Sequence, residues 1–260
     1  MVNLMEINPE FRFADYAPEI FTLDGPSAVG KGTLCKLIKE EIAKTVEPEK
    51  IRILDAGHTY RMLTYHFLKI DHLFPQNLIE MDSDLFSFLE DKVHITLEEQ
   101  EFRLNGTPTD ESLLKTPEID ALVARYSGID AVKTHIVNTQ RDFLKNNPDL
   151  WWILDGRCMG TAVAPHAKIK VYVDADPKIK AGWRYAQYAQ KDPTIAADTI
   201  YEELMRRDIM DMEAKTYPLI MPDACLFIWS HKGNAIYNAN LILDYAKSQL
   251  MFGRYKSLNI

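Results

Sequence analysis

One short stretch carries the residue types that hold phosphate groups in proteins. GPSAVGKGT, residues 25–33, places glycines at Gly25 and Gly30, a lysine at Lys31 and a hydroxyl at Thr33. The glycines let the backbone turn so that its N–H groups point at phosphate oxygens, and the lysine can reach terminal phosphates. The predicted phosphate-binding loop consists of Gly25, Pro26, Ser27, Ala28, Val29, Gly30, Lys31, Gly32 and Thr33.

The order of residues in this loop indicates a P-loop of a particular form. The residue after Lys31, commonly a Ser or Thr on a magnesium ion, is Gly32, and the hydroxyl follows one position later at Thr33. This GKGT form resembles nucleoside monophosphate kinases, so we expect a weak, water-mediated Mg²⁺ contact at Thr33. A glycine-rich turn with a chance lysine is the alternative. The apolar run before the loop and the helical pattern after it favour the P-loop.

Two arginines follow apolar runs and could bind a second phosphate. In the motif DAGHTYR, a helix that starts near His58 would put Arg61 in its first turn, where it could hold an acceptor phosphate bidentately. In the motif LDGRCMG, Asp155 ends a predicted strand, as the acid near magnesium does in P-loop enzymes. Arg157 could clamp a phosphoryl group during transfer. Either arginine could instead be a solvated turn residue, but the two motifs together favour a shared site.

A third arginine lies in RRDIMDMEAK, residues 206–215. Arg207 and Asp211 are four positions apart, so they share one face of a predicted helix, with Asp208 beside them. Such a face could offer a cation to a phosphate and an acid to sugar hydroxyls. The alternative is an i,i+4 ion pair between Arg207 and Asp211 worth about 0.3 kcal/mol, and spacing alone favours that pair.

The elements that must position these residues alternate along the chain. Five apolar, β-branched runs end in a charged or turn residue and predict strands at residues 19–24, 51–55, 151–155, 169–174 and 224–229. Near-continuous apolar strands belong in a parallel sheet that is buried on both faces. Helical patterns separate them at residues 34–44, 60–70 and 118–146. This alternation predicts an α/β, doubly wound, five-stranded parallel sheet of the P-loop NTPase type, with ligands at the carboxyl ends of the strands.

Two segments interrupt the alternation. Residues 71–117 are too long for a simple crossover and contain KVHITLEE and EFRLNGT, which predict a β-hairpin in an inserted acceptor-binding subdomain. Residues 177–214 are rich in Lys, Arg, Gln and Tyr and predict a helical lid. The predicted domains are a kinase core at residues 18–70, 118–176 and 215–260, the insert at residues 71–117 and the lid at residues 177–214.

Composition limits the partners and the compartment. With 260 residues, 47% hydrophobic residues and a net charge of −8, the chain predicts a soluble globular protein without a basic face for nucleic acid or an anionic membrane. Its three cysteines are scattered, which argues against a disulfide scaffold or a zinc site. No segment reads as a signal peptide or membrane span. We expect a cytoplasmic monomer whose partners are small molecules.

Taken together, the motifs resemble the bacterial cytidylate kinase family. The resemblance runs from about Glu19 to Leu250. It rests on GPSAVGKGTLCK, DAGHTYR, LNGTPT, KTPEID, TQRDF, LDGRCMGTAVAPHAKIKVYVDAD, RRDIMD and YPLIMPDACLFI. It implies transfer of the ATP γ-phosphoryl group to CMP or dCMP with Mg²⁺, giving CDP or dCDP and ADP.

The resemblance also assigns roles to residues of this chain. It implies catalytic roles for Lys31, Arg157, Arg184 and Arg207, with ATP held by residues 25–33. The implied acceptor site consists of Asp55, Gly57, Arg61, Lys133, Asp155, Arg157, Cys158, Arg207 and Asp211. From the lid, Arg184 and Lys180 would reach ATP.

Departures from the family pattern gather on the acceptor side. The positions concerned are Ala56, Ala124, Lys133, Cys158 and Ala214, together with Trp183 in the lid. Losing three hydrogen bonds to charged groups would cost about 4 kcal/mol or more, near a thousandfold in affinity. Three hypotheses follow: a CMP or dCMP kinase with a repaired pocket, a P-loop kinase of the same fold for a different small acceptor, or a nucleotide-binding module without catalysis.

Cys158 itself allows two interpretations. It could be a small residue that fills space, as buried free cysteines commonly do. It could also be a reactive thiol whose pKa is lowered by the neighbouring guanidinium of Arg157. The frequency of buried cysteines favours the first interpretation.

Overall fold

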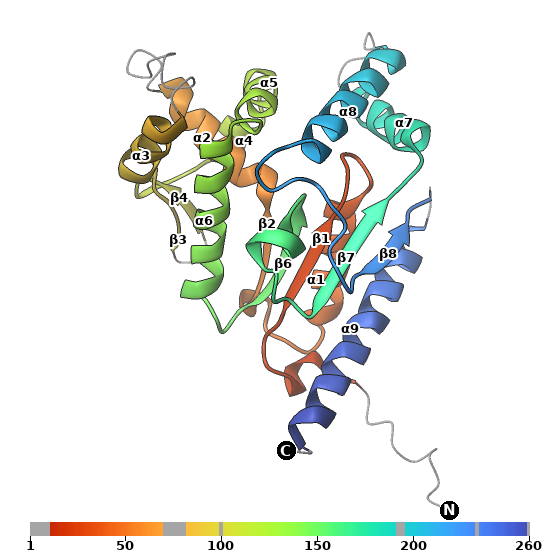
Figure 1. The fold of residues 1–260 in the computed structure, drawn as a ribbon. Helices are drawn as coiled ribbons and strands as arrows, with labels where there is room; N and C mark the ends of the chain where they lie inside the picture. Colours follow the sequence, from red (N-terminus) through yellow and green to blue (C-terminus); the bar gives the residue numbers. More distant parts are fainter. Residues whose placement is uncertain (1–10, 70–81, 99–100, 191–195, 232–233, 259–260) are drawn as a thin grey trace, which may run out of the picture.

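The computed structural model describes residues 11–69, 82–98, 101–190, 196–231 and 234–258. Its centre is a five-stranded sheet in which every neighbouring pair of strands is parallel (Figure 1). The strands are β1 (Ile20–Asp24), β2 (Ile51–Asp55), β6 (Trp151–Gly156), β7 (Ile169–Asp174) and β8 (Leu226–Trp229). Their order is β2-β6-β1-β7-β8, which confirms the predicted doubly wound parallel sheet.

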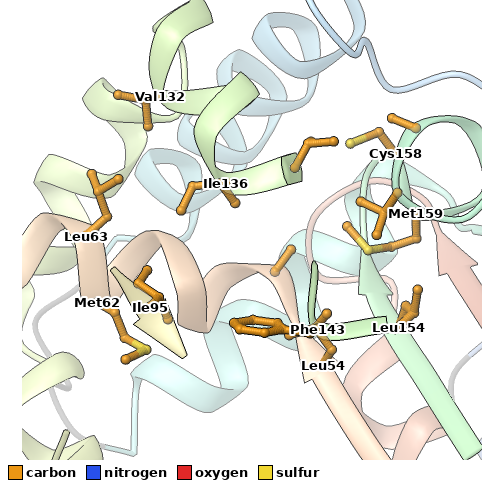
Figure 2. Close-up of a cluster of buried hydrophobic side chains, with 14 of the residues drawn as sticks. Leu54, Met62, Leu63, Ile95, Val132, Ile136, Phe143, Leu154, Cys158 and Met159 are labelled. Carbon is orange, nitrogen blue, oxygen red and sulfur yellow. The ribbon is translucent and has the colours of Figure 1, made fainter. Parts of the chain in front are cut away.

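Helices bury both faces of this sheet. On one face, α1 (Lys31–Ile42) and α9 (Ala235–Leu258) contribute to one apolar cluster. On the other face, α2 (Ala56–Lys69), α6 (Asp130–Asn146) and the π-helical turn η4 (Met159–Val163) contribute to a second cluster (Figure 2). The first four residues of β6 belong alternately to the two clusters, which is why all four are apolar.

A second, smaller sheet lies between α2 and α6 in the sequence. Strands β3 (Ile95–Glu98) and β4 (Glu101–Leu104) pair antiparallel, as the hairpin prediction requires, and β5 (Thr107–Pro108) adds to β4. Helices α3 (Asp82–Lys92) and α4 (Glu111–Leu114) flank this sheet. The turn at residues 99–100 and the start of the insert at residues 70–81 lie outside the described residues, and the domain division stays a prediction.

Two helix boundaries differ from the sequence analysis. The helical stretch at residues 118–146 is divided into α5 (Pro117–Tyr126) and α6, because Ser127 and Gly128 are poor helix formers and end α5. Helix α2 begins at Ala56 instead of near His58, since the Asp55 carboxylate accepts the Gly57 N–H at 2.8 Å. Arg61 therefore lies in the second turn of α2.

The segment predicted as a lid contains two helices, α7 (Pro177–Tyr188) and α8 (Ala197–Met212), which lie near the carboxyl ends of the strands (Figure 1). The remaining elements are the short 3₁₀ turns η1 (Phe13–Asp15) and η2 (Pro48–Lys50). In the part of the chain that the structure describes, no helix has both the length and the apolar character that crossing a bilayer requires.

Candidate active site

The predicted phosphate-binding loop joins β1 to α1, and its glycines are required by its shape. A Cβ on Gly25 would lie 1.9 Å from the Val173 carbonyl oxygen, so no larger residue fits there. Gly30 has a φ of 92° and precedes the first turn of α1. The Lys31 ammonium donates to the carbonyl oxygens of Gly25 and Pro26, at 2.9 and 2.8 Å, and thus lies across the loop.

One cavity of about 790 Å³ brings the predicted site residues together at the carboxyl edge of the sheet. The P-loop lines it from Ser27 to Thr33. The other predicted residues that line it are Asp55, Gly57, Arg61, Lys133, Asp155, Arg157, Cys158, Arg184, Arg207 and Asp211. Three of the predicted residues are not part of its lining: Gly25 and Pro26, which lie at the base of the loop, and Lys180 of the predicted lid. The role of each residue stays a prediction.

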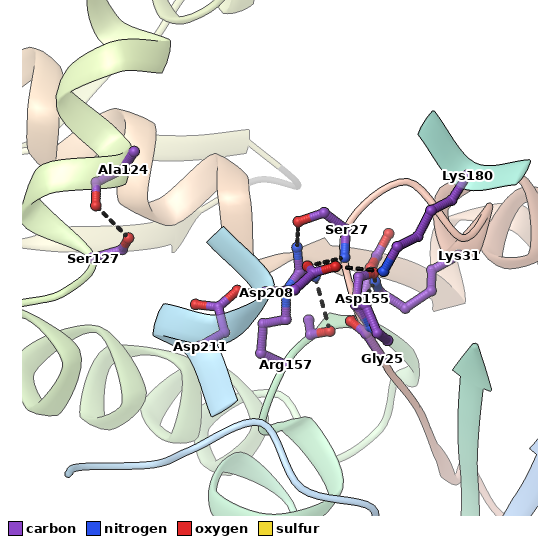
Figure 3. A network of polar contacts seen from close by, with 12 residues as sticks. Gly25, Ser27, Lys31, Ala124, Ser127, Asp155, Arg157, Lys180, Asp208 and Asp211 are labelled. Atoms are coloured by element: carbon purple, nitrogen blue, oxygen red, sulfur yellow. Dashed lines mark hydrogen bonds and ion pairs between the residues drawn. The ribbon is translucent and has the colours of Figure 1, made fainter. Parts of the chain in front are cut away.

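Arg157 connects the P-loop to helix α8. Its Nε donates to Asp211 at 3.0 Å, and its Nη2 donates to the Ser27 hydroxyl at 2.9 Å (Figure 3). Burial alone would lower the pKa of Arg157, but Asp211, Asp155 and Asp208 outweigh burial and raise it. The prediction of an ion pair between Arg207 and Asp211 is wrong, because the Asp211 carboxylate pairs with Arg157 instead.

Arg207 lies close to other positively charged side chains. Burial lowers its pKa, and the neighbouring guanidinium groups of Arg157, Arg184 and Arg61 lower it further. Arg184 lies over the ring of Tyr188, with 4.9 Å between guanidinium carbon and ring centroid. Side chains that repel one another in this way are stabilised when an anion binds between them, so the arrangement suits a phosphorylated ligand.

Arg61 approaches the same cavity from α2. Its Nε pairs with Asp120 of α5 at 3.1 Å. Asp120 is the last residue of the KTPEID motif, which supported the family resemblance without giving Asp120 a role. Because this pair joins α2 to α5, it fixes the direction of the Arg61 side chain, and only the fold shows it.

Asp155 is the acid closest to Lys31, with 3.9 Å between carboxylate and ammonium. Burial raises the pKa of Asp155, which Lys31 partly offsets, and burial also lowers the pKa of Lys31. The Asp155 carboxylate lies beside Gly32, since a Cβ built there would be 3.5 Å from its Oδ2. Thr33 follows directly and is exposed to the cavity. Hydroxyl and carboxylate oxygens are the ligands that Mg²⁺ prefers, so these residues fit a magnesium ion.

Sequence reasoning missed the part played by two buried acids. Asp24 ends β1, and its carboxylate accepts the N–H groups of Met159 and Gly160, at 2.6 and 2.7 Å. Burial raises the pKa of Asp24 to about 6. The repeated Asp at strand ends was a usable signal for Asp24. The second buried acid is Asp208, which pairs with Lys180 away from the cavity. The contact between Lys180 and ATP that the resemblance implied is therefore not supported.

The reactive interpretation of Cys158 is wrong. The side chain is buried in the apolar cluster of Figure 2. Burial, with the carboxylates of Asp24 and Asp211, outweighs the cations Lys133 and Arg157 and raises the pKa of the thiol to about 12. Cys158 therefore fills space as a neutral thiol.

Cys158 belongs to an apolar wall of the cavity that we define as Ala56, Tyr60, Val123, Val137 and Cys158. Lys133 lies beside this wall with 7% of its surface exposed. Among the described residues, its ammonium makes no hydrogen bond or ion pair. A buried lysine without a partner is costly unless a ligand supplies an acceptor.

A parallel sheet whose central strand leads into a glycine-rich loop, with cations gathered above that loop, defines a P-loop protein of the kinase type. A model of the cytidylate kinase family matches residues 21–248, so the chain belongs to that family, as the motifs predicted. It is 29% identical over 236 residues to the cytidylate kinase of Aeromonas salmonicida, covering 89% of this chain and 95% of the relative. It is 30% identical over 207 residues to that of Fusobacterium nucleatum, covering 80% and 87%.

Proposed function

We propose that this protein transfers the γ-phosphoryl group of ATP to CMP or dCMP, giving CDP or dCDP and ADP. The observation that carries the proposal is the gathering of cations around one cavity whose floor is the P-loop. These cations are Lys31, Arg61, Arg157, Arg184 and Arg207. Two phosphorylated ligands that face each other would neutralise them, and the family's members that the chain resembles are named cytidylate kinases.

The donor side of the cavity would hold ATP. The backbone N–H groups of the P-loop and the start of α1 supply donors to phosphate oxygens, and Lys31 lies across the loop within reach of them. Arg184 lies on α7 and reaches the same cavity. Bound Mg²⁺ would be held by Thr33, with Asp155 near it, and would neutralise charge on the transferring phosphoryl group.

The acceptor side would hold the nucleoside monophosphate. Arg61, fixed by Asp120, and Arg207 would bind the acceptor phosphate, while Arg157 would contact the group in transfer, since it bonds to both the P-loop and α8. Asp211 would accept from sugar hydroxyls. Catalysis of this kind rests on aligning the two phosphates and stabilising their charge without water, so no protein nucleophile is needed.

Transfer to a different small acceptor is the second candidate. The apolar wall favours it, because apart from the Tyr60 hydroxyl and the Cys158 thiol its side chains carry no polar group that could contact a base. Ser127 and Gln140 are further polar residues of the cavity lining. A nucleotide-binding module without catalysis is the third. We further propose that the protein acts as a cytoplasmic monomer on small molecules, in keeping with its free cysteines and negative net charge.

A coupled ADP-release assay with CMP, dCMP, UMP and AMP tests these proposals. We expect turnover with CMP or dCMP far above turnover with UMP and AMP. Preference for UMP or AMP would support the second candidate. Binding of ATP with no turnover on any of these nucleotides would overturn the first proposal and leave the second and third candidates.

A further inference from the structure

Asp208 and Lys180 form an ion pair that solvent scarcely reaches. The two side chains are 3% and 4% exposed, and they join α8 to α7. The Asp208 Oδ2 faces Lys180, while its Oδ1 accepts the backbone N–H of Ser27 at 2.8 Å (Figure 3). The carboxylate therefore ties the P-loop to the base of both lid helices.

An apolar cluster joins the same two helices. Ala181, Ile200 and Leu204 form a buried cluster between α7 and α8, and Ala28 of the P-loop packs against it. Ala28 has a φ of 60°, a left-handed conformation that is costly for a residue with a Cβ. A strained turn persists only where its neighbours hold it, and Ser27, the residue before it, is the one that Asp208 holds.

Ser27 is in fact held twice from the same helix. Its amide donates to Asp208, and its hydroxyl accepts from Arg157, which pairs with Asp211. Asp208 and Asp211 are three positions apart on α8, so they face the same side. Helix α8 thus fixes the position of Arg157 relative to the P-loop.

We propose that Asp208 is a positioning residue: by accepting the Ser27 N–H, it holds the P-loop in the conformation that binds ATP phosphates, and Lys180 holds its carboxylate in the orientation this requires. This role rests on the proposed binding of ATP at the loop. The base of the lid is then part of the ATP site and does not swing freely over it.

Two double variants separate positioning from mere stability. Lys180→Met/Asp208→Asn and Lys180→Met/Asp208→Leu both remove the two buried charges, so neither leaves an uncompensated charge behind. Asn can still accept the Ser27 N–H, and Leu cannot. The affinity for ATP is measured by isothermal titration calorimetry, at a temperature where the melting curves show both variants folded.

We expect ATP to bind roughly tenfold more weakly to the Leu variant than to the Asn variant, with the KM for ATP rising in parallel and the KM for CMP unchanged. Glu203→Gln, an exposed change on the same helix, serves as the control and should bind ATP like the parent. If the Leu variant does not fold, Lys180→Met/Asp208→Ala replaces it with the same expectation.

Equal ATP affinity of the two folded double variants would overturn the role of Asp208 and leave the proposed function intact. Failure of the parent protein to bind ATP would overturn both. The two outcomes are distinguished by the parent measurement alone.

Discussion

On the donor side of the cavity, charged groups hold the P-loop from several directions, whereas the part of the acceptor side around the buried Lys133 is bordered by the apolar wall. The P-loop is fixed by Lys31 from within, by Asp208 at an amide and by Arg157 at a hydroxyl. Lys133 has no such partner among the described residues. The difference indicates that phosphate binding is built into the fold, while the choice of acceptor depends on a few side chains.

The largest effect should come from breaking the donor side. Lys31→Met removes the cation from the P-loop with little change in length, and we expect turnover to fall about a thousandfold or more. ADP release measures turnover, and the melting temperature serves as the control for folding. A variant that kept a tenth of the parent turnover would show that the loop amides suffice.

A smaller loss should follow when the link between the two sides is removed. For Arg157→Ala we expect turnover to fall about a hundredfold, because charge on the phosphoryl group in transfer loses its clamp. Calorimetry should find the ATP affinity within about threefold of the parent, since Lys31 and the loop amides remain. Loss of ATP affinity with unchanged turnover would place Arg157 on the donor side alone.

The acceptor side should respond more weakly and more selectively. Lys133→Met removes an ammonium that has no partner among the described residues, and we expect the KM for CMP to rise about tenfold. The KM for ATP should not change, which is the internal control. An unchanged KM for CMP would mean that Lys133 does not contact CMP, and would favour another substrate.

Asp24, which is buried and does not line the cavity, should affect stability more than turnover. Its folded pKa of about 6 exceeds the usual 3.8, so the native state binds the proton more tightly, and stability falls as the pH rises through this window. From pH 7 to pH 5, the parent should gain about 1 kcal/mol relative to Asp24→Asn. Urea unfolding of both proteins at each pH measures the difference, and a pH-independent difference would contradict the shift.

Local patterns made most of the fold predictable. Strands and the P-loop were predictable because a strand, a glycine-rich turn and a helix follow one another in the chain. The bond between Asp208 and Ser27 spans 181 positions, and no local pattern encodes which buried acid meets which amide. For the same reason, sequence spacing favoured an Arg207–Asp211 pair, whereas Arg157 from another element takes Asp211 in the fold.

The strand order has a consequence for how the protein is made. Strand β1 is synthesised before its hydrogen-bonding partners β6 and β7. Ile20 can pair with Trp152, and Phe21 with Ile169, only after those later strands have been made. Pairing over such distances is slow, and an unpaired strand invites aggregation in the meantime. Strand β1 and the P-loop that follows it can therefore reach their native conformation only after most of the chain has been synthesised.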